Sequence, residues 1–172
     1  MVTCKDYAQF VKNKLKTKIK GMEKKPVLAI IQVGDNQASN SYVKGKVKDC
    51  EEVGIRCIVS KLDKAIEEHE LLYHIELTTC AADGIIVQLP LPKHINVEHV
   101  KNAIPKEKDV DGFRLDSKFD CCTPKGIIDW LYFNGYDVCG KNVVVLGRSE
   151  IVGKPLVNML IDRGATVTCC NR

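Results

Sequence analysis

Short apolar runs separated by helix-length segments constrain the fold of this chain more than any other feature. The clearest run, Val27–Val33, carries no charged residue and ends at a Gly-Asp pair, as expected of a strand buried on both faces. Strands that alternate with helices predict βαβ units, and therefore an α/β fold with parallel sheets covered on both faces. The predicted strands are 27–33, 55–62, 83–87, 142–146 and 165–170, and the predicted helices are 7–19, 37–53, 65–79, 123–134 and 151–163. Thr123 is the expected N-cap of its helix, with Pro124 at the first helical position.

Length and composition indicate a soluble globular protein. The chain has 172 residues, 45% of them hydrophobic, which suffices for one domain and a little more. No run approaches the ~20 apolar residues of a membrane span, and the first twenty residues contain no signal-peptide core. The nine cysteines are odd in number and form no CxxC motif. We therefore expect free thiols in a reducing cytoplasm, no metal site and no membrane partner.

The first 25 residues are strongly basic. They contain eight lysines against two acidic residues, a net charge of +6, whereas the whole chain carries +4. A solvated helix face is the favoured interpretation, and attraction of an anionic ligand tail is the alternative. No aromatic residues alternate with these lysines, so we expect no nucleic-acid partner.

A glycine-containing turn follows the predicted strand 142–146. Gly147–Gly153 leads from this strand into a helix, and such a turn lets backbone N–H groups approach a phosphate. Ser149 stands where a GxGxxG motif would have its second glycine, so an ordinary strand-to-helix turn is the alternative. The next strand ends near Arg172 without an acidic residue for the ribose of NAD. Arg148 and Arg172 therefore favour NADP, unless Arg172 is simply a polar strand end.

Three polar positions in the first half are candidates for a binding site. Tyr42 and Lys46 are four residues apart on one predicted helix and so share a face, where a ring and an ammonium group would meet a flat substrate. A solvated helix is the alternative for both. Gln88 directly follows a buried strand, where ligands of parallel sheets bind, although a plain polar strand end is equally compatible. Asp109 and Asp111 alternate along the chain and would face one side of an extended segment, whereas an exposed turn is the commoner arrangement.

Five motifs in fixed order resemble one known family. They read SYVKGKVKDCEEVGI, DGIIVQLPLPKHI, PKEKDVDGF, CTPKGI and VVVLGRSEIVGKP. Together they closely resemble the bifunctional methylenetetrahydrofolate dehydrogenase/cyclohydrolase family, called FolD in bacteria, from about Pro26 to Arg172. The resemblance implies NADP-dependent oxidation of 5,10-methylenetetrahydrofolate to the methenyl form, and hydrolysis of that form to 10-formyltetrahydrofolate.

The resemblance also assigns roles to single residues. It implies that Lys46 handles protons in the hydrolysis, that Tyr42 packs on the aromatic part of the folate, and that Gln88 hydrogen-bonds near the lysine. Asp111 corresponds to the aspartate that holds the pterin, for which a carboxylate suits the adjacent N–H donors. The corresponding NADP-binding residues are Gly147, Arg148, Ser149, Ile151, Gly153 and Arg172.

The chain departs from the family pattern in three places. An opening strand before the first helix is missing or very short, and the stretch Arg114–Cys122 is several residues shorter than expected. After Val138 only about one βαβ unit follows, so the nucleotide-binding part is expected to be truncated. We expect a three-layer parallel-sheet folate domain at 1–122, then a connecting helix and the start of a Rossmann-type domain at 123–172. The alternative is a non-enzymatic or cyclohydrolase-only folate-binding remnant, and the homodimer that the family forms is in doubt.

Overall fold

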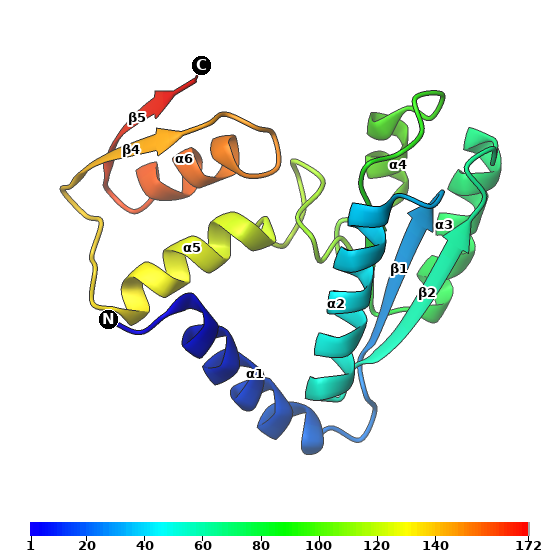
Figure 1. Ribbon diagram of the computed structural model, residues 1–172, viewed down its shortest axis with the longest axis horizontal. Coiled ribbons are helices and arrows are strands. Elements are labelled where there is room, and N and C mark those ends of the chain that lie inside the picture. The colour runs from blue at the N-terminus through cyan, green and yellow to red at the C-terminus, as the bar shows by residue number, and fades with distance from the viewer. Residues whose placement is uncertain (172) are drawn as a thin grey trace.

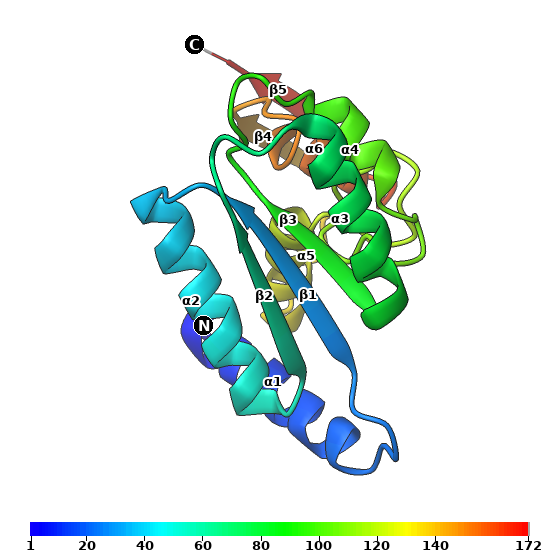
Figure 2. The same ribbon diagram turned by 90° about the vertical axis from the view of Figure 1, so that its right-hand side faces the viewer.

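The computed structural model describes residues 1–171 and contains two separate parallel sheets (Figure 1). In the first sheet the strand order is β2-β1-β3. One helix, α2, covers one face of this sheet, and α3 and α4 cover the other (Figure 2). These elements are β1 (Val27–Val33), α2 (Gln37–Val53), β2 (Arg56–Leu62), α3 (Glu68–Ala81), β3 (Gly84–Gln88) and α4 (Val97–Ala103). The predicted three-layer α/β unit with a parallel sheet is confirmed.

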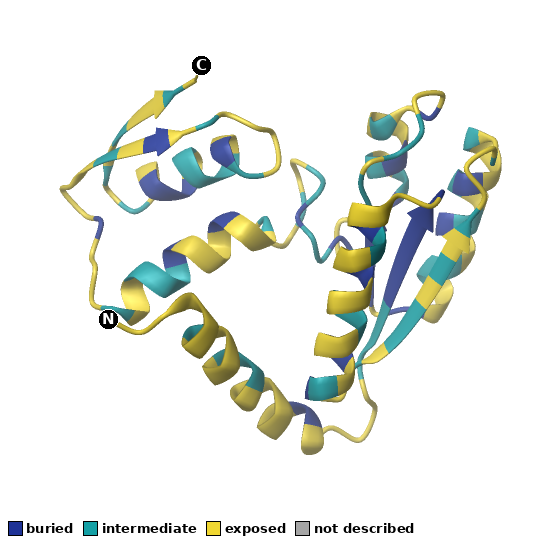
Figure 3. Ribbon diagram, viewed as in Figure 1, coloured by how far each residue is buried: buried dark blue, intermediate teal, exposed yellow. Residues whose placement is uncertain are grey.

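The charge-free central strand β1 builds cores on both faces of the sheet. Its alternate residues Ala29, Ile31 and Val33 pack with the buried residues of α3, whereas Ile30 packs against Val43 of α2. Pairing with a strand on either side satisfies the backbone of β1, and its apolar side chains are buried on both faces of the sheet (Figure 3).

Truncating the central strand should strongly destabilise the first unit. Ile31 is 0% exposed, so Ile31→Ala should lower the free energy of unfolding by about 2–5 kcal/mol through lost burial and a cavity. Urea unfolding would measure this. Leu115→Ala is the control, because that side chain is 103% exposed and its loss should cost at most about 0.5 kcal/mol. Equal unfolding midpoints for the two variants would contradict the expectation.

The ends of α2 follow from its sequence. Asn36 caps the start by accepting a hydrogen bond from the Ser39 backbone N–H, and Gly54 ends the helix in the left-handed conformation with φ of 88°. The predicted bounds 37–53 are therefore confirmed. The predicted helix 65–79 is found at 68–81, because Glu67 and Glu70 form a reciprocal capping box that starts it later.

The lysine-rich helix α1 (Cys4–Lys20) packs against α2. Lys12 pairs with Asp49 and Glu52 of α2, and Lys16 also reaches Glu52. Hydrogen bonds from Lys12 and Gln9 lower the pKa of Glu52 to about 2. Part of the basic charge is thus balanced by acidic residues of this chain, which supports the interpretation of a structural helix face.

The second sheet has two parallel strands and belongs to the predicted start of a Rossmann-type unit. Its elements are α5 (Cys122–Phe133), β4 (Asn142–Leu146), α6 (Gly153–Ile161) and β5 (Thr166–Cys170). α6 packs on one face through Met159 and Leu160, which meet Ile128 of α5 and Val145 of β4. The ring of Tyr7 on α1 packs against the ring of Phe133 on α5 in a tilted arrangement, with centroids 4.9 Å apart, so α1 contacts helices of both units (Figure 1).

Two further predicted helix starts are wrong. Thr123 lies inside α5 and is not its N-cap, because the helix begins at Cys122 after Cys121. Pro124 is still tolerated in this first turn, where a backbone N–H has no partner within the helix. The helix predicted at 151–163 is the shorter α6, since its first turn is replaced by the compact loop that ends at Gly153.

Candidate functional site

The carboxyl ends of β1 and β3 lie side by side at one edge of the first sheet. After β1 the chain enters α2 on one face, whereas after β3 it continues to α4 on the other (Figure 2). Such divergence opens a crevice between neighbouring strand ends, where α/β proteins bind ligands. Gln88 ends β3 in this position, and the cis peptide bond between Leu89 and Pro90 follows it.

Lys46 of α2 reaches Gln88 across this crevice. Its Nζ donates to Gln88 Oε1 at 3.1 Å, while Gln88 Nε2 donates to the Leu89 carbonyl at 2.9 Å. Ser39 Oγ donates to the same carbonyl at 3.1 Å. Because the amide nitrogen is used by Leu89, the amide oxygen is left to face the ammonium group. Lys46 is partly buried and hydrogen-bonded, so it is not a freely solvated side chain.

Tyr42 lies one turn before Lys46 on α2, as its spacing predicts. Its side chain is 68% exposed, and it is available as a flat surface beside the crevice. The position of Tyr42 is set by the backbone of α2, whereas the side chain of Lys46 also has a hydrogen-bond partner on β3.

Asp111 lies in the loop that precedes α5 and borders the crevice. Together with Gln88 it borders a cavity of about 130 Å³, which Ile151 and Val152 of the glycine turn also line. The cavity is lined by Val87, Gln88, Leu89, Asp111, Gly112, Phe113, Cys121, Cys122, Thr123, Ile151 and Val152. The first α/β unit and the glycine turn of the second therefore meet at the side chains that the sequence singles out.

The turn from β4 to α6 is tightly closed. Gly147 has φ of +112°, and a Cβ placed on Gly153 would lie 2.7 Å from the Gly147 carbonyl carbon and 2.8 Å from Arg148 Cα. Only glycine permits this contact between the two ends of the turn. Ser149 Oγ accepts from the Gly153 N–H at 3.3 Å, and Arg148 extends into solvent. A turn of this kind brings backbone and a helix start close to a bound phosphate.

Comparison with known families agrees with this arrangement. A family model described as "Tetrahydrofolate dehydrogenase/cyclohydrolase, catalytic domain" matches residues 2–111. A second, described as the NAD(P)-binding domain of the same proteins, matches residues 121–172. The chain belongs to the tetrahydrofolate dehydrogenase/cyclohydrolase family. The resemblance drawn from the five sequence motifs is thereby confirmed.

Solved and curated members of the tetrahydrofolate dehydrogenase/cyclohydrolase family share this fold and sequence. The FolD crystal structure from Campylobacter jejuni has a TM-score of 0.91 and 41% identity, covering 98% of this chain and 65% of that one. The Trypanosoma brucei enzyme, solved with NADP cofactor and an inhibitor, has a TM-score of 0.90 and 27% identity, covering 99% and 64%. "Bifunctional protein FolD" of Paracidovorax citrulli is 46% identical over 157 residues, covering 85% of this chain. The chain spans 56% of the length of that curated relative.

The structure does not confirm every prediction made from the sequence. Arg172 lies outside the described residues. Asp109 and Asp111 do not form one carboxylate pair, because the segment is a turn and Asp109 points inward, where it is 0% exposed. Within residues 1–171 no cluster of His, Cys, Asp or Glu suits a metal ion. In the same range no helix is long and apolar enough to cross a membrane.

Sequence reasoning missed Cys122, which shares the cavity with Asp111. Desolvation, followed by the charge and the hydrogen bond of Asp111, raises the pKa of the Cys122 thiol to about 11, against the opposing effect of the nearby Lys46 ammonium. Cys122 is exposed, so these neighbours lie close to the thiol but leave it accessible to solvent. Cys122 is the first residue of the CTPKGI motif, but nothing in the sequence indicated that Asp111 and Lys46 would be its neighbours.

Removing the carboxylate of Asp111 should make Cys122 easier to deprotonate. In Asp111→Asn the thiolate loses a repelling charge, so its pKa should fall and alkylation should begin at lower pH. Iodoacetamide rates from pH 7 to 11, followed at Cys122 by peptide mass spectrometry, would measure the shift. Asp129→Asn is the control on the same helix, where the carboxylate pairs with Lys125. Coinciding pH profiles for Asp111→Asn and wild type would contradict the placement.

Proposed function

We propose that the protein acts in one-carbon folate metabolism. The proposed reactions are NADP-dependent oxidation of 5,10-methylenetetrahydrofolate to the methenyl form, and hydrolysis of that form to 10-formyltetrahydrofolate. The observation that carries the proposal is the meeting of Lys46, Gln88 and Asp111 around a crevice that the glycine turn also lines. Family membership adds the reaction class, since its relatives are named dehydrogenase/cyclohydrolase.

Each site residue of the first unit has its own proposed role in binding or hydrolysing the folate. Tyr42 offers an exposed ring for the aromatic part of the substrate, and Asp111 accepts hydrogen bonds from the N–H donors of the pterin. Lys46, held by Gln88, is placed to transfer protons when water adds to the methenyl carbon. Gln88 keeps the ammonium group in place and limits its rotation, because its own orientation is fixed by the Leu89 carbonyl.

The glycine turn suits NADP. The close contact at Gly153 leaves no room for a side chain at the start of α6, and a start without a side chain favours close approach of a pyrophosphate to the backbone. Gly147, Arg148, Ser149, Ile151 and Gly153 would hold the cofactor, and Arg172 is proposed to meet the 2′-phosphate. When bound, NADP supplies hydride acceptance. This chain's own contribution to that step is alignment, since Ile151 and Val152 border the same cavity as Gln88 and Asp111.

The finer assignments belong to the same proposal. We divide the chain into a folate-binding domain at 1–122 and a connecting helix with the start of the NADP-binding domain at 123–172. The nine cysteines are all unpaired, which supports a reducing, cytoplasmic location. A homodimer is what the family resemblance implies, and sedimentation analysis of the purified chain would test it.

A second candidate is a cyclohydrolase-only or non-enzymatic folate-binding module. It is favoured by the fact that Tyr42, Lys46 and Gln88 all lie in the first unit, which has its own sheet and core. To separate the candidates, methylene- and methenyltetrahydrofolate are supplied one at a time, the first with NADP. Turnover of both supports the bifunctional enzyme, and turnover of the methenyl form alone supports the module with hydrolysis. Binding without turnover supports a non-enzymatic module, and absence of binding contradicts both.

A further inference from the structure

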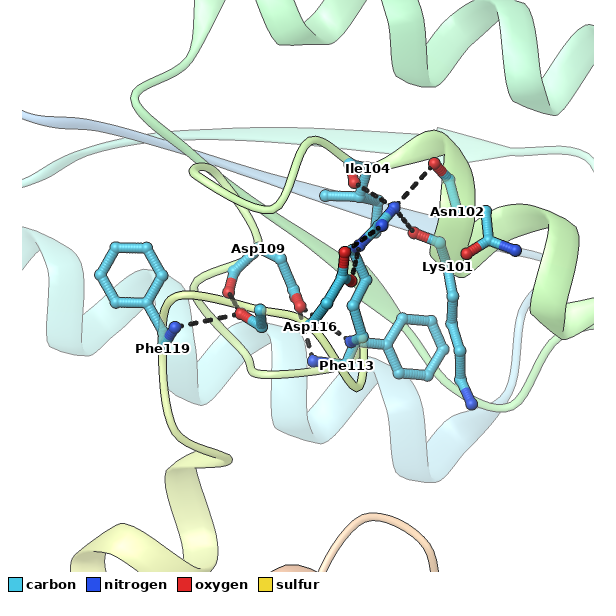
Figure 4. A network of polar contacts seen from close by, with 9 residues as sticks. Lys101, Asn102, Ile104, Asp109, Phe113, Asp116 and Phe119 are labelled. Carbon is cyan, nitrogen blue, oxygen red and sulfur yellow. Dashed lines mark hydrogen bonds and ion pairs between the residues drawn. The ribbon is translucent and has the colours of Figure 1, made fainter.

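The loop between the two matched family regions is held by a polar network of its own. Residues 112–120 fall outside both family models, and they overlap the stretch Arg114–Cys122 that departs from the family pattern in sequence. In the structure this loop runs from the end of the Asp109 turn to the start of α5, close to α4 (Figure 4). Asp111 stands at its beginning, so whatever fixes the loop also fixes Asp111.

Asp109 forms the inner anchor of the network. Its buried carboxylate accepts the backbone N–H of Phe113 at 3.1 Å and of Arg114 at 2.8 Å (Figure 4). Its carbonyl oxygen accepts from Ser117 Oγ at 2.9 Å. The position is tied to the sheet, since Asp109 forms a parallel bridge to Ile85 of β3. Within residues 1–171 no lysine or arginine forms an ion pair with this carboxylate. Its two backbone N–H donors therefore make it a fixed hydrogen-bond acceptor for this turn.

Arg114 forms the outer anchor. Its Nη1 donates to the carbonyls of Asn102 at 2.9 Å and Ile104 at 3.1 Å, at the C-terminal end of α4, where helix carbonyls lack partners. Its Nε and Nη2 donate to the two carboxylate oxygens of Asp116, at 2.7 and 2.9 Å (Figure 4). One guanidinium group therefore joins the loop to itself and to α4.

The base of the loop is closed by direct backbone contact. Gly112 has φ of +66°, and a Cβ there would lie 2.5 Å from the Cys121 backbone nitrogen. Cys121 Sγ also donates to the Gly112 carbonyl at 2.9 Å. With both anchors and the base fixed, the turn between Asp109 and Arg114 has one orientation. In this orientation Asp109 points into the protein and Asp111 points into the cavity with Gln88.

We propose that Asp109 and Arg114 are positioning residues for Asp111, and that they set the affinity of this chain for the pterin without contacting it. The inference rests on the proposed function, since it needs Asp111 to bind a folate. A purely structural role for the network is the competing explanation. The two differ in one respect, because positioning residues must act through Asp111, whereas a structural role would lower stability independently of it.

A double-mutant cycle distinguishes these explanations. The ligand is tetrahydrofolate, which has the pterin but no one-carbon group to react, and its dissociation constant is measured anaerobically by calorimetry. We expect Asp111→Asn, Asp109→Asn and Arg114→Gln each to weaken binding by about tenfold or more, as the loss of a charged hydrogen bond does. The doubles Asp109→Asn/Asp111→Asn and Arg114→Gln/Asp111→Asn should bind no worse than Asp111→Asn alone.

The matched control is Arg163→Gln. Arg163 Nη1 donates to the Met159 carbonyl of α6 at 2.9 Å, so this arginine supports a helix in the same way but far from Asp111 in the chain. It should lower the melting temperature and leave the dissociation constant unchanged. If Asp109→Asn does not fold, the cycle with Arg114→Gln carries the test, because Arg114 is only partly buried and pairs with the exposed Asp116, whereas Asp109 is 0% exposed.

The outcomes separate the inference from the function beneath it. Additive losses in the doubles, or unchanged affinity in the Asp109 and Arg114 variants, would overturn the positioning role while leaving the folate site intact. No binding by wild type would overturn the proposed function and the inference together. Weaker binding in Asp111→Asn with non-additive doubles supports both.

Discussion

Replacing Lys46 with methionine is expected to lower the rate of methenyltetrahydrofolate hydrolysis by about 10²–10⁴-fold, the usual contribution of a positioned acid or base. Methionine retains much of the length and apolar volume of the lysine stem but removes every proton that Nζ exchanges. Gln88 Oε1 then loses its 3.1 Å partner and faces a thioether. The rate is measured from the decay of the methenyl absorbance, after subtraction of the uncatalysed hydrolysis.

Another lysine of α2 supplies the control for Lys46. Lys44 lies on the same helix two residues away and is exposed, so Lys44→Met removes the same charge without touching the crevice. It should retain wild-type hydrolysis. Tetrahydrofolate binding should survive in both variants, because Tyr42 and Asp111 are unchanged. Equal rates for Lys46→Met and wild type would remove Lys46 from the proposed mechanism, whatever the folate affinity.

The fold was predictable wherever one residue type decides the local structure. A run without charge gave β1, and Gly54 gave the end of α2, because few alternatives exist for either. The start of α5 was misplaced, since Pro124 is acceptable at several positions of a first turn and so does not fix the boundary. Helix and strand identity thus followed from sequence, whereas boundaries depended on contacts with distant segments.

The site was predictable only in part, for a similar reason. Helix-face and strand-end geometry made Lys46 and Gln88 candidates, and the family resemblance supplied their roles; the structure brings the two together. Spacing alone did not distinguish Asp109 from Asp111, and only the family resemblance singled out Asp111, whereas the structure turns Asp109 inward and leaves Asp111 in the cavity. Asp109 is held inward by the backbone N–H groups of Phe113 and Arg114, and the Arg114 side chain in turn contacts the end of α4, about ten residues back in the chain. A loop without periodicity gives no signal for such contacts.

Adding a single methyl group at Gly153 is expected to abolish NADP binding. The Cβ of Gly153→Ala would lie 2.7 Å from the Gly147 carbonyl carbon, and the neighbouring atoms are backbone, so the turn itself must move. Overpacking of this kind typically costs about 1–3 kcal/mol in stability. The same movement displaces the backbone that is proposed to bind the pyrophosphate. Wild type with NADP at a hundred times its dissociation constant should gain about 2.7 kcal/mol in unfolding free energy, whereas the variant should gain none.

Gly126→Ala separates this effect from glycine replacement in general. A Cβ on Gly126 meets nothing within 4 Å, and the residue lies inside α5, where alanine favours the helix by about 1 kcal/mol. This control should therefore be at least as stable as wild type and keep its full response to NADP. Urea unfolding of the three proteins with and without NADP gives both quantities from one series. A Gly153→Ala variant that is destabilised yet still gains about 2.7 kcal/mol with NADP would show that the turn supports the fold but does not hold the cofactor.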